Sequence, residues 1–195
     1  MPLPTYNKSA RRKTFEALPK GAYVVKIISA KQEAWPSGDQ VLRIAFDIAE
    51  GEYKGFYQKQ FESDTREDKK WSFDAVFNLN VPKDGGQEYI RTNWNTFFAD
   101  LEDSNNGFVF DGDIKKLKGK IIGGKFRIKQ TQKDDKVYDH TELYWTCVAD
   151  DVRSGKPGKL PNDKLIGKGS TRSRSTSGDD DFMTIPDDAE EELPF

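Results

Sequence analysis

The 195-residue sequence predicts a mainly β domain with a minor helical part. Three observations carry this prediction. Short segments rich in Val, Ile, Tyr and Phe alternate apolar with polar residues, which is typical of strands. Turn sequences containing Gly, Pro and Asp separate these segments. One longer segment repeats its apolar residues with the period of an α-helix.

The first three strand-like segments lie between residues 22 and 62. Residues 22–31 carry apolar side chains at both alternating sets of positions, as in a strand that is covered on both faces. Residues 56–62 are predicted to form the third strand. Between them, residues 41–49 alternate strictly, so Arg43 and Asp47 are expected on the outer face. The residues expected inside are Leu42, Ile44, Phe46 and Ile48.

A helix and a hairpin follow. Residues 64–86 show no clear period, but residues 87–103 carry one apolar stripe at helical spacing. The stripe consists of Ile90, Trp94, Phe97 and Leu101. Residues 120–131 and 137–150 then alternate as two strands around a turn. Three strands, a helix and a hairpin form the element order of an OB-fold, a five-stranded Greek-key barrel with a helix between strands three and four.

The composition divides the chain into a basic N-terminal arm (1–20), the predicted domain (21–153), a linker (154–178) and an acidic tail (179–195). The linker holds five Gly, five Ser and two Pro in 25 residues, so we expect it to be flexible and the tail after it to be disordered.

The charge distribution separates the tail from the rest of the chain. The tail holds eight acids and no Lys or Arg; removing them leaves 31 basic and 25 acidic residues before it. This surplus of six positive charges favours an anionic partner such as nucleic acid.

The sequence contains few residues suited to disulfides, zinc sites, membrane spans or catalysis. The single cysteine, Cys147, excludes an internal disulfide, and with one histidine, His140, no Cys/His zinc site is expected. Without an 18-residue apolar run or an apolar signal core, we expect a cytoplasmic protein. No constellation of catalytic residues stands out, so we expect a protein without enzymatic activity, cofactor or metal.

Two stretches resemble single-stranded-DNA-binding proteins. The end of the chain, Glu190 to Phe195, resembles the C-terminal tip of the bacterial proteins, an acidic run closing in Ile-Pro-Phe, with Leu193 in place of the isoleucine. Residues 21–55 are similar to the opening of a family of such proteins from phages and mobile elements of Gram-positive bacteria. The resemblance implies binding of single-stranded DNA with little sequence preference, in phage or mobile-element replication and recombination inside a bacterial host.

Two sets of side chains are candidates for DNA binding. Cations on one face of the fourth predicted strand and in nearby elements are expected to meet phosphates, although a solvated strand face has the same pattern. They are Lys125, Arg127, Lys129, Lys133, Arg43 and Lys59. The candidates for base stacking are Trp35, Tyr57 and Tyr144. The two tyrosines fit a hydrophobic core equally well.

The tail is expected to recruit replication or recombination proteins. Its acids steer it toward basic partners, and a basic pocket there would hold the terminal carboxylate while burying the Phe195 ring. The docking residues are Glu191, Glu192, Leu193, Pro194 and Phe195. A solubilising tail is the alternative. For the whole protein, an RNA-binding barrel of cold-shock type and a barrel that binds only protein also remain open, as does a homo-oligomer.

Overall fold

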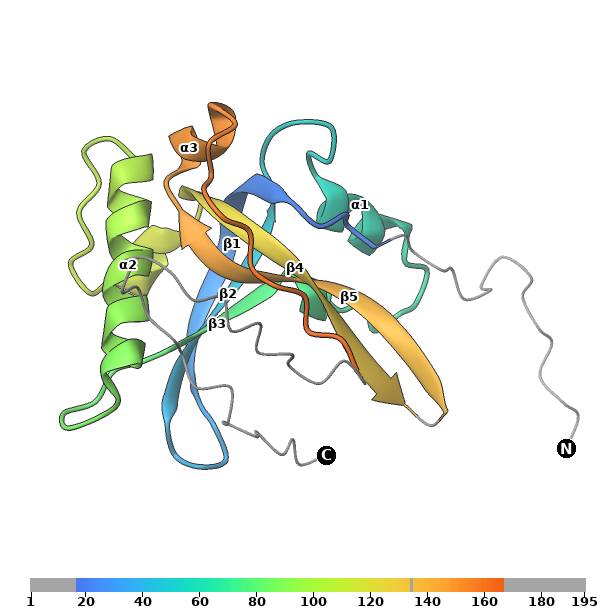
Figure 1. Cartoon of the computed structure of the whole chain (residues 1–195), viewed down its shortest axis with the longest axis horizontal. Coiled ribbons are helices and arrows are strands. Elements are labelled where there is room, and N and C mark those ends of the chain that lie inside the picture. The colour runs from blue at the N-terminus through green and yellow to red at the C-terminus, as the bar shows by residue number, and fades with distance from the viewer. Residues whose placement is uncertain (1–16, 134, 167–195) are drawn as a thin grey trace, which may run out of the picture.

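A computed structural model describes residues 17–133 and 135–166 of the chain (Figure 1). Its five strands are β1 (Ala22–Ala34), β2 (Gln40–Ile48), β3 (Val76–Asn80), β4 (Ile121–Lys133) and β5 (Lys136–Cys147). Its helices are α1 (Phe56–Ser63), α2 (Glu88–Ser104) and α3 (Ala149–Arg153), with 3-10 turns η2 (Phe73–Ala75) and η3 (Ile114–Leu117). Within these ranges no helix has the length and apolar character needed to cross a membrane.

The strands form one antiparallel sheet in the order β3-β2-β1-β4-β5, which confirms a mainly β structure with a helix between its third and fourth strands. β1 is central and pairs with both β2 and β4. The edge strands β3 and β5 come close to each other, yet no described residue pair joins them in a ladder. α2 packs against β3, β4 and β5, and α1 packs against β2, well apart from α2 (Figure 1).

The core lies on the inner face of the sheet, where Tyr57 of α1 and Phe97 and Leu101 of α2 pack with the strand side chains. The four side chains of β2 that were expected inside are all buried, and rings from β2 and β4 meet edge to face across the central β1, as Phe46 and Phe126 do at 5.8 Å. From the helical stripe, Phe97 and Leu101 are buried, while Trp94 packs at the margin of the core. Strict alternation therefore predicted the apolar core residues of β2 correctly, and helical spacing predicted the two most buried residues of α2, Phe97 and Leu101.

The predicted third strand is wrong, because residues 56–62 belong to α1. The cause is Asp47, which was expected on the outer face but is only 6% exposed. Its carboxylate accepts hydrogen bonds from the backbone N–H groups of Tyr57 at 2.9 Å and Gln58 at 3.3 Å. These are N–H groups of the first helical turn, which have no partner within a helix, so an acid from β2 stabilises the start of α1. The true third strand, β3, lies in the region without a clear period.

The predicted flexible linker is wrong for its first part. The fifth strand ends at Cys147, and α3 leads into a segment, residues 155–166, that we call the C-terminal strap. Lys164 forms a parallel bridge with Lys129: its N–H donates to the Ile128 carbonyl at 2.9 Å, and its carbonyl accepts from the Gln130 N–H at 2.8 Å. The strap therefore lines the part of β4 that β1 does not reach.

The end of the predicted N-terminal arm also belongs to the fold. Leu18 is buried in the core, and its carbonyl accepts a hydrogen bond from the Thr141 hydroxyl of β5. Lys20 pairs with Asp163 of the strap at 2.9 Å. Residues 1–16, the rest of the predicted linker and the acidic tail lie outside the described residues.

Candidate nucleic-acid interface

The basic stripe of β4 lies on one face of the sheet, as predicted. Directly paired residues of antiparallel strands share a face. Lys125 pairs with Trp145, Arg127 with Glu142 and Lys129 with His140, so β5 supplies the neighbours of all three cations. We call this surface of β4 and β5 the stripe face.

The charge of the stripe face is smaller than the sequence indicates. Glu142 pairs with Arg127 at 2.7 Å and with Lys129 at 3.2 Å, so one carboxylate opposes two cations. Lys125 takes part in no ion pair among the described residues. Among the three cations of the stripe, Lys125 is therefore the one that a phosphate can contact without displacing a carboxylate.

Two adjacent aromatic residues of β5 flank these cations. The register shifts between Lys125 and Phe126, so Tyr144 and Trp145 together occupy the space of one residue on β5. Trp145 is 40% exposed, and its ring centroid lies 5.2 Å from that of Tyr144. The Arg127 guanidinium lies 3.6 Å from the Tyr144 ring centroid and covers that ring. Trp145 is thus the more accessible stacking surface.

The sequence interpretation missed Trp145 because alternation groups it with the buried Leu143 and Cys147. The available signal was the pair Gly123-Gly124, which indicated a bulge or bend. A Cβ placed on Gly123 would lie 2.7 Å from the Cys147 sulfur, and one on Gly124 would lie 2.6 Å from a Leu143 methyl. Neither position has room for a side chain: the β5 backbone lies too close at Gly123, where a Cβ would be 2.8 Å from the Cys147 carbonyl oxygen, and core side chains fill the space at Gly124.

The predicted stacking role of Tyr57 is wrong for this structure, because the ring lies in the core at 2% exposure. Burial raises the pKa of its hydroxyl, and the nearby acids Asp74 and Asp47 add to that effect. Trp35 lies in the turn between β1 and β2 and is half-buried. Its indole N–H donates to the Asn80 side-chain oxygen at 3.3 Å, so one edge of the ring is fixed to β3.

A second aromatic group lies where η2 meets β5. Phe73 is 67% exposed, and its ring centroid is 4.9 Å from that of His140. The His140 ring nitrogens lie 2.8 Å from the Thr131 hydroxyl and 3.4 Å from the Asp74 carboxylate. Burial raises the pKa of Asp74, and the neighbouring His140 opposes that rise. His140 is thus a hydrogen-bonding strand residue, and Phe73 is an exposed ring that sequence reasoning did not select.

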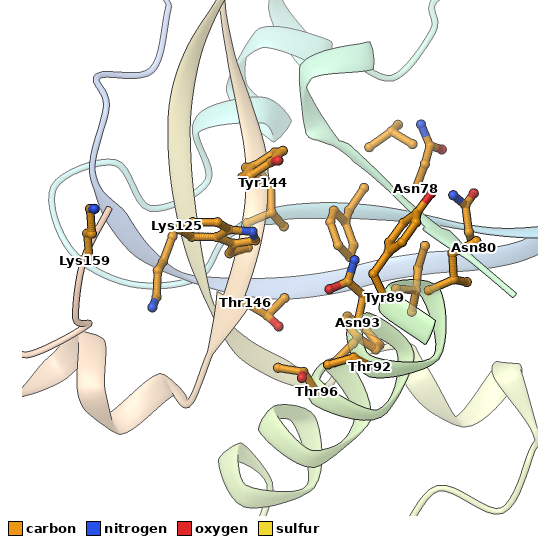
Figure 2. A pocket seen from close by; sticks show the side chains of 17 residues that line it. Asn78, Asn80, Tyr89, Thr92, Asn93, Thr96, Lys125, Tyr144, Thr146 and Lys159 are labelled. Carbon is orange, nitrogen blue, oxygen red and sulfur yellow. The ribbon is translucent and has the colours of Figure 1, made fainter. Parts of the chain in front are cut away.

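A groove of about 780 Å³ opens between β3, α2 and β5 (Figure 2). Lys125 and Lys159 of the strap line one side, Tyr144 and Thr146 lie between, and polar side chains of β3 and α2 form the other side. The Thr146 hydroxyl donates to the Asp100 carboxylate of α2 at 2.6 Å, which fixes that helix to β5.

Of the remaining predicted cations, Arg43 and Lys59 lie apart from the stripe. Arg43 of β2 pairs in register with Asn78 at the edge of the groove and forms an ion pair with Glu33 at 3.0 Å. Lys59 is exposed on α1, away from α2 and the groove. Lys133 ends β4, but its side chain lies outside the described part. The docking residues of the tail, Glu191 to Phe195, fall outside it too.

The described residues contain no grouped metal ligands, and the one cysteine is buried. Within ranges 17–133 and 135–166, no three His, Cys, Asp or Glu side chains are grouped to hold a metal ion. Cys147 is buried, and burial raises the pKa of its thiol to about 11. The thiol is therefore protonated at neutral pH.

Over residues 5–85 the chain is similar to a family described as "Protein of unknown function (DUF669)". The match covers less than half of the chain. It spans β1, β2, α1 and β3 and ends before α2, β4 and β5, so it does not include the stripe face. No curated protein matches this sequence.

Proposed function

We propose that this protein binds single-stranded DNA, without enzymatic activity and with little sequence preference. The observation that carries the proposal is the stripe face, where Lys125, Arg127 and Lys129 share one surface with the exposed ring of Trp145. Cations that follow a strand meet successive phosphates, while aromatic faces stack on bases of any identity. A single strand offers both features, because its bases are unpaired.

The OB-fold is part of this proposal. A central β1 that pairs with both β2 and β4, a helix between β3 and β4, and edge strands that approach without pairing support a partly open five-stranded barrel. In such barrels, the loops between strands one and two and between strands four and five border the binding surface. Trp35 lies in the loop between β1 and β2. The basic stripe runs along β4 toward the loop between β4 and β5.

The proposed biological role and host rest on the resemblance of the chain end and of residues 21–55 to single-stranded-DNA-binding proteins. It favours a protein that coats DNA exposed in phage or mobile-element replication or recombination, within the cytoplasm of a bacterial host. The acidic tip, Glu191 to Phe195, would recruit basic partner proteins.

The test is a tryptophan-fluorescence titration with a single-stranded pyrimidine oligonucleotide at several salt concentrations. Binding should weaken with salt, and the triple variant Lys125→Ala, Arg127→Ala, Lys129→Ala should lose about 0.7 of log–log salt slope for each phosphate contact removed. An unchanged slope places the binding surface elsewhere. Tighter binding of the matched RNA favours an RNA-binding protein, and absence of salt-dependent binding to either strand leaves a protein-only adaptor.

A further inference from the structure

The groove beside the stripe face is lined by amide side chains whose hydrogen-bonding groups are unused. Asn78 of β3 and Asn93 of α2 are both exposed, and neither carboxamide has a hydrogen-bond partner among the described residues. The third amide of the groove, Asn80, differs because its oxygen accepts from the Trp35 indole. Figure 2 shows Asn78 and Asn93 on one side of the groove and Lys125 and Lys159 on the other.

This arrangement separates two kinds of chemistry across one groove. The lysine side matches a phosphate, which two ammonium groups neutralise. The amide side matches a nucleobase edge, because a carboxamide carries donors beside an acceptor and pairs with the same combination on a base. Tyr89 of α2 lines the groove as well and offers an aromatic ring. The volume, about 780 Å³, lies within the range of small-molecule sites.

We infer that the groove between β3, α2 and β5 takes an unpaired nucleobase of the bound strand, with Asn78 and Asn93 on its Watson–Crick edge and Lys125 and Lys159 on its phosphate. The inference rests on the proposed function. It adds a means of distinguishing a single strand from a duplex, which the cations of the stripe do not provide. Cations bind the phosphates of any nucleic acid, whereas an edge that is hidden in a duplex distinguishes a single strand. A carboxamide presents either its donor or its acceptor after rotation, so the site accepts more than one base.

The experiment compares an oligothymidylate with the same strand built from N3-methylthymidine. The methyl group blocks the Watson–Crick edge but leaves the phosphates and the ring faces in place. We expect the protein to bind the methylated strand about five-fold or more weakly, since one well-formed pair with a base edge gives at least that discrimination. The double variant Asn78→Ala, Asn93→Ala should bind both strands alike.

The matched control is Asn106→Ala, an exposed asparagine beyond the end of α2 that does not line the groove. It should keep the discrimination, and melting temperatures should show that all variants fold. Equal binding of the two strands by the unaltered protein overturns the inference but leaves single-strand binding standing. Discrimination that survives in the double variant also overturns it. Absence of salt-dependent binding to the unmodified strand removes the proposed function and the inference together.

Discussion

At the scale of single residues, Trp145 and Trp35 offer a direct comparison of two indoles. Trp145 is 40% exposed beside the cations, while Trp35 is half-buried and hydrogen-bonded to Asn80. Trp145→Ala should therefore weaken single-strand binding by roughly 1–3 kcal/mol, the range for loss of one stacked base, with little change in melting temperature. Oligonucleotide titrations measure the affinity, and thermal melts measure the stability, of the Trp145→Ala and Trp35→Ala variants. A larger affinity loss in Trp35→Ala would move the stacking site to the β1–β2 turn.

Glu142 neutralises part of the positive charge of the stripe, so removing its charge should strengthen the binding of single-stranded DNA. The carboxylate pairs with Arg127 and Lys129, so a phosphate must compete with it for both cations. Glu142→Gln keeps the side-chain shape and removes the charge. We expect tighter binding and a salt slope steeper by about 0.7 for one further phosphate contact.

Glu33→Gln is the matched control for that prediction, because Glu33 pairs with Arg43 on the β1–β2 surface. Both pairs are at least partly exposed, so both variants should melt close to the unaltered protein. If Glu33→Gln tightens binding and Glu142→Gln does not, the phosphates follow β2 rather than β4.

The residues that the sequence predicted correctly are those in unbroken patterns. Lys125, Arg127 and Lys129 share a face because β4 alternates without interruption between them. Trp145 was missed because a register shift on β5 breaks that alternation, and a one-residue shift reverses the face of a side chain. Tyr57 was misplaced because the helix around it depends on Asp47, a partner ten residues away.

At the scale of elements, the length and period of a segment decided how well it was predicted. α2 and the β4–β5 hairpin are long and periodic, and their bounds lie within a few residues of the prediction. β3 has only five residues, and its short alternation includes two asparagines, which are uncommon in strands, so the segment was not recognised as a strand. The strap has linker composition, and its hydrogen bonds to β4 become visible only in three dimensions.

Asp163 anchors the strap, which leads to a prediction about its pH dependence. The carboxylate accepts from the Ile128 N–H at 3.0 Å and pairs with Lys20 at 2.9 Å. The hydrogen bond from Lys20 lowers the pKa of Asp163. A carboxyl group whose pKa is lowered on folding stabilises the folded protein at pH values above the ordinary carboxyl pKa. This stabilisation is lost as the pH falls through the lowered pKa. The strap should therefore stay attached at neutral pH and loosen only in acid.

Asp163→Ala should loosen the strap at neutral pH. The Gln130 amide donates to Lys164 of the strap, so its hydrogen exchange should accelerate, while the Ile27 amide, bonded to the Lys120 carbonyl, should keep its rate. Exchange measured by NMR tests both. Equal acceleration at the two amides would mean that the substitution destabilises the whole domain, and no change at Gln130 would mean that Asp163 does not hold the strap.

At the scale of the whole molecule, two regions of opposite charge share one chain. Residues 179–195 carry eight acids, and the preceding residues a surplus of six positive charges. The Ile166 N–H donates to the Gln130 side-chain oxygen at 3.1 Å, so the chain leaves the described part beside β4. The 12 residues from 167 to 178 span at most about 40 Å. The acids are therefore within reach of the stripe face and would compete there with DNA phosphates.

Deletion of Asp179–Phe195 should consequently tighten single-strand binding, most clearly at low salt, where charges are least screened. Removing Phe195 alone should leave DNA binding unchanged, because all eight acidic side chains remain, yet it should abolish docking to a basic partner protein that binds the unaltered chain. Titrations at two salt concentrations separate these effects. Weaker DNA binding after the deletion would make the acidic segment part of the binding surface, and unchanged partner docking without Phe195 would reduce the tip to a solubilising tail.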